Sequence, residues 1–523
     1  MSSFPFLSVL TGAPLIGALV VALLPKTKPG LAKTVALAWS LAILGLTAVM
    51  YVTFQVNGPR FQFRESYPWI NAWGTRFTFE ADGIALVMLA LIALLVPLVI
   101  LASWHDAEPA KRSVPVYFAL LLALESTMIG VFAAADIFLF YVFFEVMLVP
   151  MYFLIGSYGG PRRQYAAVKF FLYSLVGGLL MLAAVVGIWV VGRSQLGHAT
   201  FDWHELTRLS MSSGTERWLF LGFFLAFAIK APFFPFHTWL PDAGGAAPAG
   251  AAALLVGVLD KVGTFGILRY CLPLFPNAAK YFAPLGLALA LVGIVYGALL
   301  AVGQNDLKRL VSYTSIAHFG FIGIGIFAFT SQAGTGAVLY MVNHGLATGL
   351  LFLVVGMLVA RRGSALVSDF GGAGKLVPVL AGVFLIAGLA SLALPGTSPF
   401  VSEFLVLLGT FTVNKTVAVI ATFGIILAAG YVLWMVQRTT QGTLNPALEK
   451  VDEMRRDISP REVAVVAPLI ALILLLGFYP KPVLDVVNPA VQATFSQIGT
   501  ADPNPTVRAH NPTTPPSAPG GGK

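Results

Sequence analysis

Fourteen apolar segments follow one another along this 523-residue chain, and each is long enough to cross a lipid bilayer. A spanning helix needs about 20 apolar residues, because the hydrocarbon layer is about 30 Å thick and a helix rises about 1.5 Å per residue. Backbone groups inside lipid must be paired within their own segment, so each segment is predicted to be helical. The segments cover residues 6–24, 32–54, 80–103, 114–133, 136–157, 165–191, 218–240, 246–272, 280–302, 309–330, 336–360, 378–409, 413–437 and 461–485. The predicted fold class is therefore an all-α integral membrane protein with about 14 transmembrane helices.

The composition agrees with a bilayer environment. Hydrophobic residues make up 58% of the chain and charged residues 11%, whereas soluble domains carry about 25% charged residues. The net charge of +9 is spread over short loops, which indicates membrane topology and not a nucleic-acid surface. The first segment lacks a charged leader and a cleavage site, so we interpret it as a transmembrane helix and not as a signal peptide.

The basic residues of the short loops predict the orientation. With the N-terminus outside, the inward loops hold about seventeen lysines and arginines, against about eleven in the outward loops and tail. The pairs at 111–112, 162–163, 308–309 and 361–362 all fall on the inward side. Because cytoplasmic loops are enriched in Lys and Arg, both termini are predicted to lie outside.

The fourth to eighth segments form one set of five, and the ninth to thirteenth form another. In each set the fourth helix is interrupted by prolines, at Pro232 and Pro235 and at Pro395 and Pro399. Five crossings is an odd number, so the two copies are inverted, as in many transporters. The predicted units are 1–113 (helices one to three), 114–275 (first repeat), 280–437 (second repeat), 438–500 (an inner surface helix and helix fourteen) and 501–523 (a flexible Pro/Gly-rich tail).

Two lysines at predicted membrane depth stand out. Lys230 lies near the middle of its apolar helix, just before the first proline break, and Lys261 lies deep in the next helix beside Asp260. An ammonium at mid-membrane costs about 3 kcal/mol on insertion scales, so such residues usually mark ion or proton pathways. The structural alternative is a lysine that is salt-bridged for packing or that reaches the membrane surface.

Further ionisable residues at membrane depth extend this set. Glu403 occupies in the second broken helix the place that Lys230 holds in the first, and Glu145 lies in the fifth segment. His318 and His344 lie in helices rich in small residues, and imidazole both accepts and donates protons near neutral pH. The alternatives are a protonated carboxyl that joins helices and histidines that merely fill the core. Glu125 has a structural and a functional interpretation of similar weight.

Six strings between residues 143 and 409 are distinctive: FFEVMLVPMYFLIG, AFAIKAPFFPFHTWLPDA, GVLDKVGTFGILRY, NDLKRLVSYTSIAHFGFI, NHGLATGLLFL and PGTSPFVSEFLVLLG. They resemble the antiporter-like membrane subunits of proton-pumping NADH:quinone oxidoreductase, respiratory complex I. The similarity covers roughly residues 80–440. Within this family the acidic Glu403 favours the subunit M group, since the sister subunits generally carry lysine there.

The resemblance implies a role for each matching residue. Glu145 pairs with Lys230, which holds a proton at the first broken helix, and Lys261 relays laterally. His318 and His344 continue the path with bound water, and Glu403 is the terminal proton carrier. The chain departs from the family at Gly244–Ala247, where a histidine and an acidic residue are common, and at Asp260, which is not general in the family.

The resemblance also implies a subunit of an enzyme whose redox centres lie elsewhere. The single cysteine and the GGAGK string at 371–375, which lacks phosphate-loop spacing, predict no cofactor or metal site here. NADH, FMN, iron–sulfur clusters and quinone are expected in partner subunits, with neighbouring antiporter-like subunits as partners in a bacterial inner (plasma) membrane. The alternatives are a subunit of a multisubunit sodium/proton antiporter or membrane-bound hydrogenase, and a purely structural membrane spacer.

Overall fold

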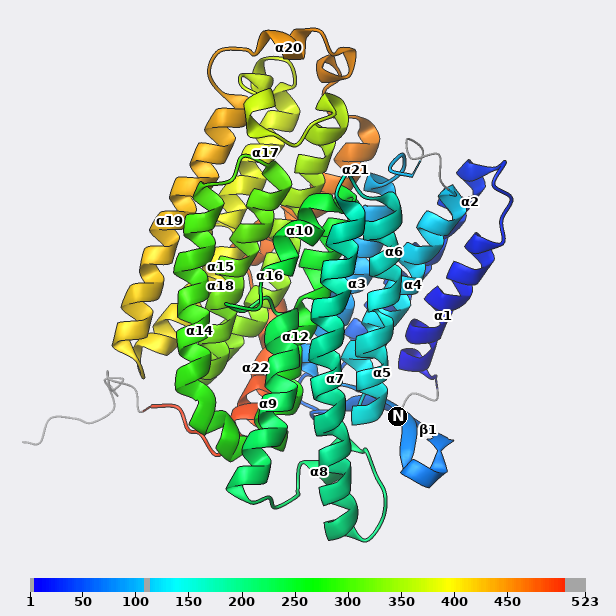
Figure 1. Cartoon of the computed structure of the whole chain (residues 1–523), viewed down its shortest axis with the longest axis vertical. Coiled ribbons are helices and arrows are strands. Elements are labelled where there is room, and N and C mark those ends of the chain that lie inside the picture. Colours follow the sequence, from blue (N-terminus) through cyan, green and yellow to red (C-terminus); the bar gives the residue numbers. More distant parts are fainter. Residues whose placement is uncertain (1–3, 108–112, 504–523) are drawn as a thin grey trace, which may run out of the picture.

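The computed structural model describes residues 4–107 and 113–503, and most of its helices run side by side between two ends of the molecule (Figure 1). We name these ends the α20 end, at the top of Figure 1, and the hairpin end, where β1 and α8 lie. The helices are α1 (Phe6–Ala22), α2 (Pro29–Thr53), α3 (Gly83–Ala102), α4 (Val114–Ala133), α5 (Ile137–Val146), α6 (Leu148–Tyr158), α7 (Arg163–Leu196), α8 (Trp203–Leu206), α9 (Ser213–Lys230), α10 (Trp239–Ala246), α11 (Ala249–Leu254), α12 (Lys261–Gly266), α13 (Leu272–Leu274), α14 (Pro276–Val302), α15 (Leu307–Phe327), α16 (Ser331–Arg362), α17 (Pro378–Ser391), α18 (Ser398–Phe411), α19 (Lys415–Thr440), α20 (Pro446–Glu449), α21 (Pro460–Phe478) and α22 (Lys481–Gln497).

Each of the fourteen predicted segments corresponds to a helix or to a run of helices. Eleven helical stretches of the described residues are long and apolar enough to cross a membrane, and α1, α17 and α18 are shorter apolar helices. The pairs α5–α6, α9–α10 and α17–α18 each form one interrupted crossing, and α11 to α13 form one crossing with two π-helical turns. The prediction of an integral membrane protein with about 14 helices is confirmed.

Prolines explain the two broken helices. Pro232 and Pro235 lie between α9 and α10, while Pro395 precedes α18 and Pro399 lies in its first turn. A proline lacks the N–H that would continue the helical hydrogen bonds, so carbonyls are left free at each break. The side chain of Trp239 donates to one of them, the Ile229 carbonyl, at 2.9 Å. The breaks recur at the fourth crossing of each five-helix set, as the inverted-repeat prediction requires.

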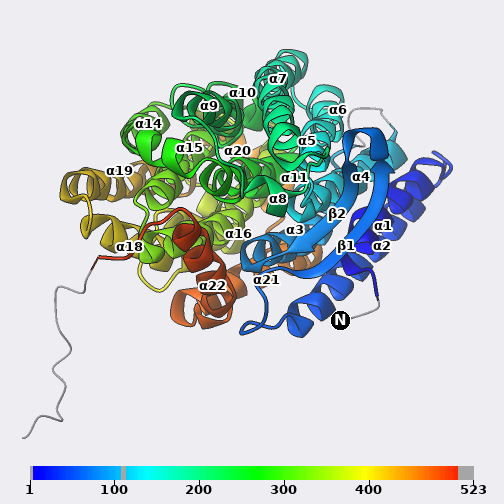
Figure 2. The same cartoon turned by 90° about the horizontal axis from the view of Figure 1, so that it is seen from below.

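The most deeply buried crossings form the centre of the bundle. Most residues of α3, α4, α11 to α13, α15 and α16 are buried, whereas most residues of α2, α7, α14, α19 and α21 are at least partly exposed. Seen along the bundle, α16 lies near the middle, with α1 and α2 at one edge and α19 at the other (Figure 2). Apolar side chains on the outer helices are what lipid would contact, so polar groups on the central helices lie far from it.

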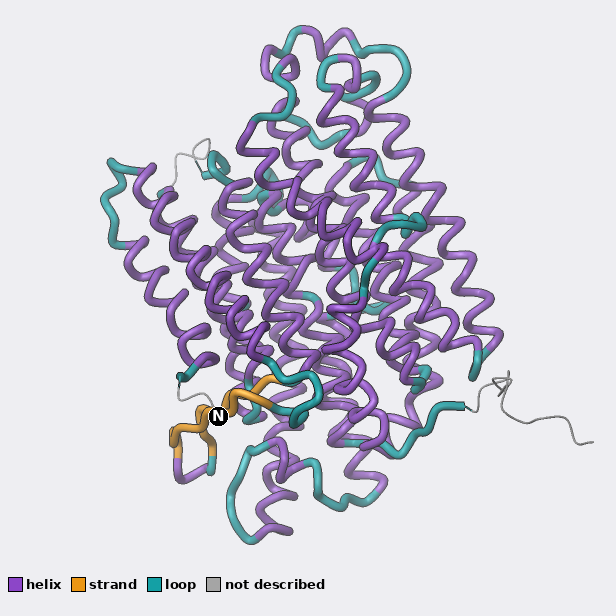
Figure 3. The backbone as a smooth tube through the Cα atoms, turned by 180° about the vertical axis from the view of Figure 1, so that it is seen from behind, coloured by secondary structure: helices purple, strands orange, loops and turns teal. Residues whose placement is uncertain are grey.

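A two-stranded antiparallel hairpin lies at the hairpin end, coloured orange in Figure 3. Its strands are β1 (Gln62–Ile70) and β2 (Thr75–Ala81), with Glu65 opposite Phe79 and Tyr67 opposite Phe77. The sequence analysis did not predict these strands or the amphipathic helix α22, which buries Val487, Val491 and Phe495 and packs on α3 and α16. The two strands pair with each other across a short turn, whereas α22 packs on crossings that are distant in the chain.

Three other predictions concern the surface helix within 439–460, the C-terminal tail and one basic loop pair. The predicted surface helix within 439–460 is only the short α20 and one 3₁₀ turn, Asp452–Arg455. The predicted tail, from residue 504 onward, and the basic pair Lys111 and Arg112 lie outside the described residues.

Candidate functional site

Lys230 is the last residue of helix α9, and its side chain is fully buried among polar and aromatic groups. Its Nζ lies 3.4 Å from the Ser174 hydroxyl on α7, over the ring of Phe144 at 4.8 Å and that of Phe170 at 5.7 Å. Attraction between a cation and aromatic faces contributes most where water is absent. These contacts orient the ammonium but give it no carboxylate within hydrogen-bonding distance among the described residues.

Glu145, on helix α5, is the charged group that acts most strongly on Lys230. Its carboxylate acts electrostatically on Lys230, and its buried Oε1 has no hydrogen-bond partner in the described part of the chain. The carboxylate fits because residue 178 on α7 is glycine: a Cβ there would lie 2.6 Å from Glu145 Cδ and closer still to Oε1. The glycine therefore sets where the carboxylate can lie.

Lys261 stands at the centre of the bundle, with an exposed fraction of 0%. Its ammonium donates to the Val256 carbonyl, to Asp260 Oδ1 at 3.2 Å and to His344 Nδ1 at 2.7 Å. The Val256 carbonyl belongs to a π-helical turn, Leu255–Leu259. Such turns free a carbonyl from the helical pattern and are frequent at functional sites.

His344 on α16 links this ammonium to helix α15. Because a lysine ammonium only donates, Nδ1 of His344 accepts, and its Nε2–H donates to the Ser315 hydroxyl at 3.2 Å. The His318 ring lies beside it, with 5.2 Å between ring centroids, and His318 Nδ1 is buried without a partner among the described residues. The two histidines are thus in contact, and together with Lys261 they form one polar cluster.

Glu403 lies on α18, after the second break, and is 5% exposed. It acts electrostatically on Tyr340 and Tyr431, whose buried hydroxyls have no hydrogen-bond partner among the described residues. Tyr340 also contacts the His318 ring, with centroids 5.9 Å apart. Asn343 holds the start of α18 by donating to the Ser398 carbonyl at 2.7 Å. Tyr340 therefore lies between the histidines and Glu403.

Five of the six sequence-predicted residues are buried and Glu145 is partly buried, and the structure joins them in groups of neighbours, although not every neighbouring pair is in direct contact. Lys261, His344 and His318 meet directly, Glu145 faces Lys230, and Glu403 is reached past Tyr340. Glu125 is separate: it is fully buried, and neither carboxylate oxygen has a partner among the described residues.

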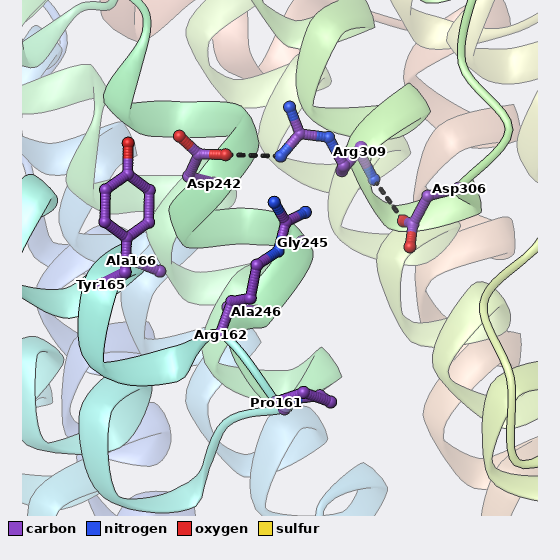
Figure 4. Close-up of a pocket in the computed structure, with 10 residues that line it drawn as sticks. Pro161, Arg162, Tyr165, Ala166, Asp242, Gly245, Ala246, Asp306 and Arg309 are labelled. Atoms are coloured by element: carbon purple, nitrogen blue, oxygen red, sulfur yellow. Dashed lines mark hydrogen bonds and ion pairs between the residues drawn. The ribbon is translucent and has the colours of Figure 1, made fainter.

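A polar cluster near the α20 end was missed by the sequence analysis, which expected little polarity after the Gly244–Ala247 departure. Asp242 on α10 pairs with Lys169 on α7 at 2.7 Å and with Arg309 on α15 at 2.5 Å. Arg162 and Asp306 join Asp242 and Arg309 around a cavity of about 150 Å³ (Figure 4). The signal was present in the LPDA string, but its partners come from distant helices.

A second cluster that was missed lies at the hairpin end. Arg269, in the eighth crossing, pairs with Glu80 at 3.0 Å and with Asp82 at 3.3 Å, while His204 meets Glu80 at 2.9 Å. Burial by itself would raise the pKa of Glu80, but the His204 hydrogen bond and the charges of Arg269, His204 and Arg64 hold that pKa below its usual value.

No group of three or more His, Cys, Asp or Glu side chains that could hold a metal ion occurs within residues 4–107 and 113–503. The polar side chains that meet inside the bundle include several that bind or release protons, together with hydroxyl groups. Chemically, such a set supports proton transfer between neighbouring groups.

Comparison with known proteins places this arrangement among membrane subunits. The family described as NADH:quinone oxidoreductase/Mrp antiporter, TM, matches residues 134–428. NADH-quinone oxidoreductase subunit M of Mycobacterium tuberculosis (strain ATCC 25618 / H37Rv) is 46% identical over 540 aligned residues, which cover 97% of each chain. A chain of respiratory complex I from Thermus thermophilus with bound NADH is 31% identical, with a TM-score of 0.85, covering 94% of this chain and 100% of that chain.

The fold of this chain is also similar to that of a chain from an antiporter complex. A chain of the Mrp complex from Dietzia sp. DQ12-45-1b has a TM-score of 0.81 at 20% identity and covers 94% of this chain and 98% of that chain. At that identity the likeness concerns the fold alone.

Proposed function

The chain belongs to the NADH:quinone oxidoreductase/Mrp antiporter family of transmembrane subunits, and on that premise we propose a route by which it carries protons. It is a proton-translocating membrane subunit of NADH:quinone oxidoreductase, most similar to subunit M, and electron transfer from NADH to quinone in partner subunits drives it. A separate antiporter remains only a related family, since the likeness to the Mrp complex concerns the fold.

The route begins at Glu145 and Lys230. A proton arriving from the α20 end is held on Lys230, and the position of the Glu145 carboxylate decides how firmly it is held, because an opposite charge nearby stabilises the ammonium. The Gly178 backbone leaves room for that carboxylate on α7. A change in the separation of the pair therefore changes the proton affinity of Lys230.

The proton then passes laterally through the centre. Lys261 gives a proton to His344 Nδ1, the Nε2 proton leaves toward Ser315, and the neighbouring His318 continues the transfer. The observation that carries this proposal is the 2.7 Å hydrogen bond between Lys261 Nζ and His344 Nδ1. It joins two proton-exchanging groups that are 83 residues apart in sequence inside the bundle.

Glu403 receives the proton at the far end and releases it toward the outer side. The hydroxyls of Tyr340 and Tyr431 lack protein partners among the described residues, and bound water between them and Glu403 would complete the path. We assign the α20 end to the inner side of the membrane, because α7 begins there, with Arg163, and α16 ends there, with Arg361 and Arg362. The two ends of the described chain, at residues 4 and 503, are then on the outer side.

We propose that this chain carries no redox group and that NADH, FMN, iron–sulfur clusters and quinone bind to partner subunits of the complex. Neighbouring antiporter-like subunits would flank it in the inner membrane of a bacterium. The single buried cysteine, Cys271, is consistent with this division of labour.

The test is proton pumping driven by NADH in membrane vesicles that carry Lys230→Ala, together with electron transfer and an assembly check. Lys415→Ala is the matched control, because Lys415 is an exposed lysine at the first turn of a spanning helix. The proposal expects assembled complexes in which only Lys230→Ala loses pumping and coupled turnover. Wild-type pumping in Lys230→Ala would show that the ammonium is structural and that the route is wrong.

A further inference from the structure

We propose that Asp260 is an additional proton carrier that connects Lys230 to Lys261 across the interface of α9 and α12. This inference rests on the proposed function, because it adds a residue to the route described above. The six-residue route leaves the step between the two lysines without a carrier. A carboxylate at that point would divide one long transfer into two short ones.

The position of Asp260 suits this role. Its side chain has an exposed fraction of 0%, and it follows the π-helical turn Leu255–Leu259, with its N–H donating to the Leu255 carbonyl at 3.1 Å. Oδ1 accepts from Lys261 Nζ at 3.2 Å. Oδ2 is buried and has no hydrogen-bond partner among the described residues. One oxygen is thus committed to Lys261, and the other is open.

Close packing brings the Asp260 region next to the end of α9. Gly263, three residues after Asp260, is so close to α9 that a Cβ there would lie 2.5 Å from the Ala231 nitrogen and 2.5 Å from the Phe227 carbonyl oxygen. Lys230 precedes Ala231, and Asp260 is a charged group that acts on Lys230 directly. The carboxylate therefore accepts a hydrogen bond from one ammonium and acts electrostatically on a second, which belongs to a different helix.

The transfer balances in charge and protons. The Lys230 ammonium releases one proton, and the Asp260 carboxylate takes it up and becomes a neutral carboxyl. That carboxyl then gives the proton to a neutral Lys261 amine, which has already passed its own proton to His344 Nδ1. At the end Asp260 is again a carboxylate, Lys230 is neutral and Lys261 is charged, so one proton has moved laterally.

A purely structural role explains less of the geometry. A counter-ion for Lys261 needs only Oδ1, and Lys261 already donates to Val256 and to His344. Most buried polar atoms in folded proteins are hydrogen-bonded, so a buried carboxylate oxygen without a partner calls for an explanation. A water molecule or the Lys230 ammonium that reaches Oδ2 during transfer would provide it.

The test uses the whole complex with Asp260→Asn and Asp260→Glu, in vesicles, with pumping measured across a range of pH. Asparagine keeps the shape but cannot carry a proton, whereas glutamate keeps the carboxyl. We expect Asp260→Asn to assemble and to lower the maximum pumping rate on the order of ten-fold at every pH, since a positioned proton-transfer group contributes about 10²–10⁴-fold to its own step. Asp260→Glu should recover most of that rate.

A counter-ion role predicts a different profile. Removal of the Asp260 charge would then move the pH of maximum pumping while leaving the maximum itself unchanged, and that result would overturn the proposal. Infrared difference spectra add a direct readout: a protonated-carboxyl band that appears during turnover should be absent in Asp260→Asn. Lys230→Ala, measured in parallel, distinguishes failure of the whole proposed route from failure of the Asp260 step alone. If it pumps normally, the whole route fails, whereas normal pumping in Asp260→Asn alone removes only this carrier.

Discussion

Gly178→Ala should disturb the Glu145–Lys230 pair without altering either residue. A Cβ at position 178 would lie 2.6 Å from Glu145 Cδ, whereas carbon atoms in contact need about 3.5 Å. The carboxylate must therefore move by about 1 Å or more. Because the obstructing group is the free end of a side chain, the helix itself can stay in place.

This displacement weakens the attraction between the Glu145 carboxylate and the Lys230 ammonium. For two charges about 4 Å apart, an effective dielectric constant of about 20 gives an attraction of about 4 kcal/mol, and about 1 Å of separation removes about 0.8 kcal/mol. This corresponds to about a four-fold change in the proton affinity of Lys230. Alanine in place of glycine stabilises a helix by about 1 kcal/mol, so a weaker helix would not account for the loss.

The assay compares NADH-driven pumping and assembly for Gly178→Ala and for Gly45→Ala, since a Cβ at Gly45 meets nothing within 4 Å. We expect a loss of about four-fold in pumping for Gly178→Ala only. A double-mutant cycle with Glu145→Gln sharpens the test, because Gly178→Ala should have no further effect once the charge is gone. Full pumping in Gly178→Ala, or an equal loss in both backgrounds, would refute the reasoning.

Other predictions concern packing and the two ends of the route. Gly263→Ala places a Cβ 2.5 Å from the α9 backbone, which cannot yield as a side chain can, so we expect poor assembly on native gels. Tyr340→Phe and Tyr431→Phe remove unpartnered buried hydroxyls; thermal stability should hold or rise, while pumping falls if the hydroxyls bind water for Glu403. Glu80→Gln leaves Arg269 with one partner, and loss of a buried partner costs about 3–5 kcal/mol, measurable as earlier thermal dissociation. The lowered pKa of Glu80 means that its stabilisation is complete above about pH 4.3 and is lost as the pH falls through the folded value; Glu80→Gln should remove that acid-sensitive part.

Much of the fold could be predicted because bilayer physics acts locally. Each crossing needs only its own run of apolar residues, and each break needs only its own prolines, so α9 ends just before Pro232 and α18 begins just after Pro395. The buried lysines, histidines and carboxylates were equally visible, because an ionisable residue in an apolar run is unusual wherever it lies. Their roles stay predictions until the variants above are measured.

Apolar runs, prolines and buried charges are local features of the chain, so they specify which helices cross the membrane, where two of them break, and which ionisable residues lie inside. The tertiary structure alone decided which of those residues meet. The Lys261–His344 hydrogen bond, the room that Gly178 leaves for Glu145, and the Asp242 and Arg269 clusters all join helices that are distant in the chain. The physical reason is that the hydrophobic pattern fixes how deep a helix lies in the membrane, whereas its neighbours and its rotation follow from side-chain packing across the whole bundle.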